Sequence, residues 1–205
     1  MKPAAVLISA LVSIGCRTVA PVPGPLDPGG LAACIPADAS ALAGLDLAML
    51  RRSPLAPKLG ATFGGAEYAL IAARPREIVS ITSCAGAART PLSPLIAEAR
   101  PLAARNPVWA VIRGGSDLPL EGNLANVNTL LSDASVVRLT ARDGDGIAIE
   151  LTAECPADRA AHFENSLRAL LLLGKMASAV QLRREGSTVR ASFVAPADAL
   201  AGFLH

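Results

Sequence analysis

The alternation of apolar and polar residues predicts β-strands over long parts of this chain. It is clearest over 137–152, where apolar residues alternate with charged and hydroxyl side chains on both sides of a glycine-rich turn. A three-residue loop over 144–146 keeps the apolar faces of the two strands aligned, because it pairs Asp143 with Ile147. Such a loop ends on a residue with positive φ, and we expect Gly146 to supply it.

A second hairpin is expected close to the end of the chain. A two-residue turn at Glu185-Gly186 pairs Leu182 with Val189 and keeps the apolar residues of both strands on one face. Short apolar runs bounded by turn residues predict further strands, and apolar residues at helical spacing predict helices. The other predicted strands are 40–47, 68–73, 78–83 and 108–113. The predicted helices are 48–59 in part, 94–104, one that begins at an Asn123 cap, 157–174, and a short one from Pro196 to Phe203.

The order of these elements predicts the fold class. Strand-helix-strand-strand-helix occurs in 31–106 and begins again in 107–205, at an offset of about 67 residues. Alternating hairpin strands have one apolar and one polar face. We therefore expect an α+β domain with a mainly antiparallel sheet of about eight strands and helices packed on one face. Two βαββα-like halves are a hypothesis, since the match concerns element order and not residues.

The composition limits the kinds of partner. The chain has 205 residues, of which 52% are hydrophobic and 18% charged, so a substantial core can form. A net charge of +2, with no basic cluster among aromatic residues, argues against a nucleic-acid partner. Aromatic residues make up only 3% of the chain, which argues against a sugar-stacking surface.

Residues 1–15 have the layout of a secretory signal. Lys2 precedes an apolar run over 4–14 that is too short to cross a bilayer as a helix. The stretch from Ser13 to Cys16, Ser-Ile-Gly-Cys, resembles the lipobox of bacterial lipoproteins. This resemblance implies that Cys16 is lipidated and becomes the mature N-terminus. The family favours leucine where this chain has Ser13, and an ordinary secretory signal cut before Cys16 is the alternative.

The segment after the lipobox predicts a tether and a location. Residues 17–30 contain four prolines and three glycines, so we assign 16–30 to the anchor and tether and 31–205 to the folded domain. Arg17 stands where an aspartate would mark retention in the inner membrane. The lipoprotein resemblance therefore implies the outer membrane, facing the periplasm or the surface. Residues 35–55 also resemble openings of uncharacterised bacterial envelope proteins, which imply no activity.

The cysteines predict one disulfide. Lipidation of Cys16 would leave Cys34, Cys84 and Cys155, an odd number for an oxidising compartment. If the first two strands run the same way, the third returns to the edge where the first begins, which brings Cys34 and Cys84 together. Cys155 ends a strand in the second half and is a competing partner. No pair has the spacing of a zinc or thioredoxin-like motif.

No catalytic residue, metal ligand or cofactor is predicted. His162 has Asp158 and Ser166 one turn away, but side chains stacked along one helix do not converge on a substrate. Asp143 and Asp145 suggest a calcium loop, but a hairpin turn accounts for both. A small anion could bind at the strand-helix connection that begins at Gly114 and Gly115, if their backbone amides are free near Arg113. A plain connection between strand and helix is the simpler interpretation.

Two functions lead at this point, and a hydrolase with an unrecognised site is a distant third. The first is a lipid-anchored envelope protein with a binding or structural role that contacts the membrane through Cys16 and an unknown envelope protein through its domain. The alternative is a carrier or sensor of an apolar small molecule or lipid. Its groove would be lined by Phe163, Leu167, Leu170 and Leu171 of the predicted helix 157–174. Solid packing beneath that helix favours the first function, and an apolar cavity favours the carrier.

Overall fold

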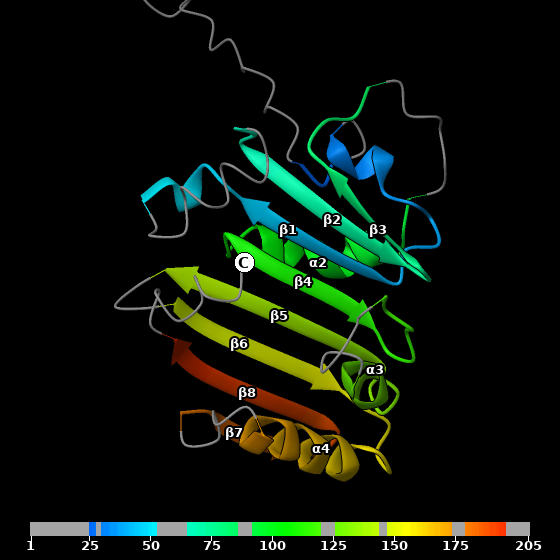
Figure 1. Cartoon of the computed structure of the whole chain (residues 1–205), viewed down its shortest axis with the longest axis vertical. Helices are drawn as coiled ribbons and strands as arrows, with labels where there is room; N and C mark the ends of the chain where they lie inside the picture. Colours follow the sequence, from blue (N-terminus) through cyan, green and yellow to red (C-terminus); the bar gives the residue numbers. More distant parts are fainter. Residues whose placement is uncertain are drawn as a thin grey trace, which may run out of the picture.

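The fold is seen in a computed structural model that describes residues 25–27, 30–52, 65–85, 92–119, 126–143, 147–173 and 179–195. This part of the chain forms one eight-stranded sheet with three α-helices (Figure 1). The strands are β1 (Ala41–Asp46), β2 (Tyr68–Arg74), β3 (Glu77–Ile81), β4 (Val108–Arg113), β5 (Val136–Asp143), β6 (Ile147–Glu154), β7 (Gln181–Glu185) and β8 (Thr188–Ala195). The helices are α2 (Leu95–Ala103), α3 (Asn126–Leu131) and α4 (Ala160–Leu173), with short 3₁₀ helices η1 (Leu31–Cys34) and η2 (Met49–Arg52).

The strand order in the sheet is β3-β2-β1-β4-β5-β6-β8-β7, and all neighbouring strands are antiparallel. The predicted α+β class and eight-stranded antiparallel sheet are confirmed. The first half contributes β1 to β3 and the second half β4 to β8, and the halves meet where β1 pairs with β4. The order strand-helix-strand-strand-helix is thus present in both halves, with η2 as the first helix.

The helices lie on both faces of the sheet, which corrects the prediction of a single covered face. On the α2 face, defined by Leu42, Leu70 and Val111, the sheet packs against α2 in one core cluster. On the α4 face, defined by Val137 and Val189, it packs against α3 and α4 in a second cluster (Figure 1). The reason is that the apolar positions change face across the sheet: Val111 of β4 is opposite the polar Arg138, so the apolar Val137 beside it lies on the other face, where α3 and α4 cover it.

The two hairpins gave opposite outcomes. The first has the predicted register, with Asp143 opposite Ile147; Gly146 itself lies outside the described residues. The second register was wrong, because Glu185 pairs with Thr188 and the turn is therefore Gly186-Ser187. Gly186 has a φ of +59°, as the first central residue of a type II′ turn requires, and this turn chemistry determines the register.

The disulfide between Cys34 and Cys84 is confirmed, with a Cα–Cα distance of 5.8 Å. The strand directions used to predict it were wrong, because β1 pairs antiparallel with β2. Since β1 and β3 both run against β2, the end of β3 lies at the same end of the sheet as the end of β1, and not at the end where β1 starts. The bridge forms because η1 packs back over the sheet, where Ala32 and Ile35 share a core cluster with Ile81.

The folded structure extends into the segment assigned to the tether. Leu26 is only 5% exposed and belongs to the core cluster beneath α2, and its carbonyl accepts a hydrogen bond from Arg100 at 3.3 Å. Residues 1–24, which include Cys16, and the predicted helix from Pro196 to Phe203 lie outside the described residues. No helix within the described ranges is long and apolar enough to cross a membrane.

Candidate functional site

The α2 face changes character halfway across the sheet. In β5, β6, β8 and β7 the residues Arg138, Thr152, Arg190 and Arg183 lie directly opposite one another in a single cross-strand row. The next row along the strands consists of Thr140, Glu150, Ser192 and Gln181. We call the surface made by these two rows the polar sheet face. Helix α2 packs mainly against β4 and β1 and reaches only the Arg138 edge of the polar sheet face. The rest of the polar sheet face has no described helix packed on it.

Two hollows in this surface adjoin each other. The first, of about 350 Å³, lies between the end of α2 and strands β5 and β6, with Arg105 and Arg142 in its lining. The second, of about 300 Å³, extends over β6, β8 and β7. Glu150 and Thr152 line both hollows, so the two hollows adjoin each other on the polar sheet face.

An arginine at the covered edge of the polar sheet face holds α2 in place. The Arg138 guanidinium donates to Glu98 of α2 at 3.1 Å and to Glu154 of β6 at 2.6 Å. Burial lowers the pKa of Arg138, but the hydrogen bonds to both carboxylates outweigh burial and raise it above its ordinary value. Arg138 is therefore a fixed positive charge with a structural role, and it lines the first hollow.

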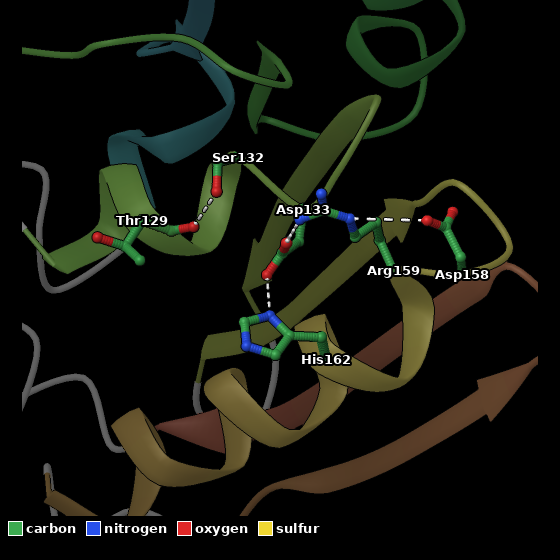
Figure 2. Close-up of polar contacts among 6 residues, drawn as sticks. All are labelled: Thr129, Ser132, Asp133, Asp158, Arg159 and His162. Carbon is green, nitrogen blue, oxygen red and sulfur yellow. Dashed lines mark hydrogen bonds and ion pairs between the residues drawn. The ribbon is translucent and has the colours of Figure 1, made fainter.

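The second candidate is a buried carboxylate, Asp133, between α3 and β5 (Figure 2). Its side chain is 3% exposed and accepts hydrogen bonds from Arg159 at 3.1 Å and from Nδ1 of His162. Burial raises the pKa of the Asp133 carboxyl, but these hydrogen bonds outweigh burial and hold it below its ordinary value. The contacts connect the α3–β5 turn to the start of α4.

Within the part of the chain that the structure describes, this cluster has no third group of the kind that nucleophilic catalysis requires. The predicted neighbours of His162 were Asp158 and Ser166, but its carboxylate partner is Asp133, which sequence reasoning missed. Figure 2 shows the Ser132 hydroxyl directed to the Thr129 carbonyl, to which it donates at 2.6 Å, and not to the imidazole. Among the described residues the imidazole of His162 is hydrogen-bonded to Asp133 and to no hydroxyl or thiol, an arrangement that orients the ring without a nucleophile.

Cys155, the free cysteine of the described residues, is not a reactive thiol. Cys155 is 7% exposed and lies in the core cluster under α4. Burial, with the nearby negative charge of Asp133, raises the pKa of its thiol. A buried thiol with a raised pKa is a poor nucleophile and a poor partner for disulfide exchange.

The anion site suggested at Gly114 and Gly115 is excluded, because both amides are already used. Gly114 donates to the carbonyl of Ser135 at 2.8 Å and Gly115 to that of Leu131 at 2.9 Å. Asp145 of the suggested calcium loop lies outside the described residues. Within the described ranges no group of three or more histidine, cysteine or acidic side chains is placed to hold a metal ion.

The residues of the suggested apolar groove are packed rather than open. Phe163 is fully buried and Leu167 is 8% exposed, in a cluster with residues of β6 and β8. Leu170 and Leu171 are partly buried against the same cluster. The apolar cavity that a carrier would need beneath α4 is therefore not seen at these four residues.

Comparison with family models, with curated proteins and with solved structures gives no match for this chain. The function must therefore be inferred from the surface itself. The polar sheet face is accessible and hollowed, whereas the Asp133 carboxylate is buried and already accepts hydrogen bonds from Arg159 and His162. The polar sheet face presents arginine, glutamate, hydroxyl and amide side chains, which are groups that can hydrogen-bond to polar ligands.

Proposed function

We propose that this chain is a lipid-anchored protein of the bacterial cell envelope that binds a partner through the polar sheet face and has no catalytic role. The observation that carries the binding role is the pair of adjoining hollows on the polar sheet face: one lies beside the end of α2, and the other, over β6, β8 and β7, has no described helix in its lining. A sheet that buries apolar residues on its other face and exposes a hollowed charged one has a surface suited to recognition.

The envelope location is supported by the start of the chain and by the disulfide. Residues 1–15 have the layout of an export signal, and Cys16 occupies the lipidated position of a lipobox-like sequence. The bridge between Cys34 and Cys84 is a feature of proteins that fold in oxidising compartments. Arg17 supports the outer rather than the inner membrane, as the lipoprotein resemblance implies.

The buried Leu26 sets how far the domain can lie from the bilayer. Only nine residue steps separate Cys16 from Pro25, where the described structure begins. At roughly 3.3–3.6 Å per residue, even a fully extended segment reaches about 30 Å. The lipid therefore holds the domain close to the membrane surface, and the partner must be within reach of that layer.

The proposal is tested by photo-crosslinking in intact cells. A crosslinking amino acid at Gln181, on the polar sheet face, is compared with the same amino acid at the exposed Ala169 on α4. We expect one discrete crosslinked species from position 181 and none from position 169. In the same cells Cys16→Ser should move the protein from the membrane to the soluble fraction. Equal crosslinking at both positions would refute the polar sheet face as the binding surface.

A further inference from the structure

The arginines of the second half of the domain differ in how their charges are balanced. Arg138, Arg142 and Arg184 each have a carboxylate within 3.1 Å, on Glu98, Glu150 and Glu164 respectively. Arg190 is 4.0 Å from Glu185, with both side chains more than 60% exposed. Arg183 has no ion pair with any residue in the described part of the chain. Positive charge is therefore left over at one place on the polar sheet face.

The two arginines with the weakest pairing also face each other. Arg183 of β7 is directly opposite Arg190 of β8, and both side chains are on the polar sheet face. Side chains that are directly opposite in an antiparallel pair have β-carbons about 5 Å apart, and like charges there destabilise the sheet. Two arginines placed opposite each other, with only one distant carboxylate between them, leave positive charge that an anion from outside can neutralise.

The surroundings of the pair indicate what kind of anion fits. The hollow of about 300 Å³ that Arg183 and Arg190 line also contains the hydroxyl of Ser192 and the amide of Gln181, which donate and accept hydrogen bonds. Guanidinium groups bind carboxylates in a planar, two-pronged geometry. Glu150 and Glu185 line the same hollow and repel a densely charged polyanion.

We infer that Arg183 and Arg190 bind a carboxylate on an acidic peptide segment of the partner. This inference rests on the proposed binding role of the polar sheet face and gives that partner its chemistry. A peptide supplies isolated carboxylates on a polar backbone. Such a ligand fits a hollow in which Arg183 and Arg190 lie together while Glu150 and Glu185 lie elsewhere in the lining. None of the side chains in the two rows is aromatic, so the face has no platform on which sugar rings could stack.

A titration followed by NMR tests the carboxylate site. Full-length protein carrying Cys16→Ser is titrated with a blocked pentapeptide of alternating serine and glutamate, with its glutamine counterpart, and with inorganic phosphate. We expect the glutamate peptide alone to shift the side-chain Nε signals of Arg183 and Arg190 in a saturable way. No shift of these signals, or phosphate binding as tight as that of the glutamate peptide, would overturn the inference.

Two variants make the test specific. Arg183→Gln removes a repulsive partner, so it should fold, and it should weaken binding of the glutamate peptide by about tenfold, as loss of a charge-assisted pair does. The control is Arg184→Gln, the adjacent residue on the opposite side of the strand, where Glu164 keeps Arg168 as a second partner. It should bind the peptide as the parent does. Equal loss in both variants would contradict a specific site.

The cellular crosslink separates this inference from the proposed function. With the crosslinker at Gln181, Arg183→Gln should abolish most of the crosslinked species. An unchanged yield would overturn the carboxylate site while the polar sheet face remained the binding surface. Absence of any crosslink in the parent protein would instead overturn the proposed function.

Discussion

The indole ring of Trp109 on β4 lies across Gly44 on β1, the residue directly opposite it in the sheet. A β-carbon at position 44 would come within 2.3 Å of the ring. The indole Nε1 donates to the hydroxyl of Tyr68 on β2 at 2.9 Å, so one side chain connects three strands at the junction of the two halves. Burial is the main reason why the pKa of Tyr68 is raised.

Gly44→Ala should lower the free energy of unfolding by about 1–3 kcal/mol, because the added methyl group overpacks a buried site. Equilibrium unfolding in urea measures this. In a Trp109→Leu background the same substitution should cost clearly less, since the ring that it meets is gone. An equal cost in both backgrounds would mean that backbone effects, and not the indole, determine glycine at this position.

Gly114→Ala should be more destabilising than Gly115→Ala. A β-carbon at 114 would lie 1.6 Å from the carbonyl oxygen of Ala134, which is backbone and cannot rotate away. Gly115 has a φ of +67° with open space around it, so alanine there costs only the strain of about 1 kcal/mol. Thermal unfolding of the two variants gives the order, and a reversed order would show that the β4–β5 approach is misplaced.

Asp133→Asn should destabilise the fold by about 1–3 kcal/mol near neutral pH, because Arg159 and His162 lose a charged acceptor. The pKa of Asp133 is below the unfolded value of about 3.9, so its contribution is present above that pH. It is lost as the pH falls through the folded pKa. The difference between variant and parent should therefore shrink in strong acid.

Asp158→Asn is the matched control for Asp133→Asn. Asp158 is 80% exposed and 3.8 Å from Arg159, so its substitution should change the unfolding free energy little at any pH. Urea unfolding at neutral pH and in acid compares the two variants. A pH-independent effect of Asp133→Asn would contradict a stabilising carboxylate.

Removal of the disulfide by Cys34→Ala with Cys84→Ala should lower stability by about 4 kcal/mol, the chain-entropy value for a loop of 50 residues. Peptide mapping of exported protein without reduction checks the pairing.

Thiol labelling should modify Cys155 only after unfolding, because it is buried. Rapid labelling of Cys155 in the native protein would contradict its place in the core.

The sequence predicted elements well where one face of a strand differed sharply from the other. In β5 the apolar residues Val137 and Leu139 alternate with arginine and threonine, and the predicted register was correct. In β7 the consecutive residues Arg183, Arg184 and Glu185 are polar on both faces, so the apolar pattern could not determine the register and the turn did. The pattern of apolar residues also does not determine which face of the sheet α2 covers.

The polar sheet face and the Asp133 cluster could not be predicted from the sequence. The row of Arg138, Thr152, Arg190 and Arg183 exists only once four strands are in register and in the observed order. Asp133 stands between apolar runs in the turn after α3, which is a signal for a buried carboxylate, but its partners come from α4 in space. Both sites depend on contacts between distant segments.

The most direct test of the polar sheet face as a binding surface is its accessibility in the native envelope. Gln181→Cys and Ala169→Cys are labelled with a maleimide in intact envelopes and in purified protein. The proposed binding role predicts that position 181 reacts much more slowly in envelopes than when purified, while position 169 reacts at the same rate in both. Equal rates at position 181 in the two preparations would contradict an occupied polar sheet face.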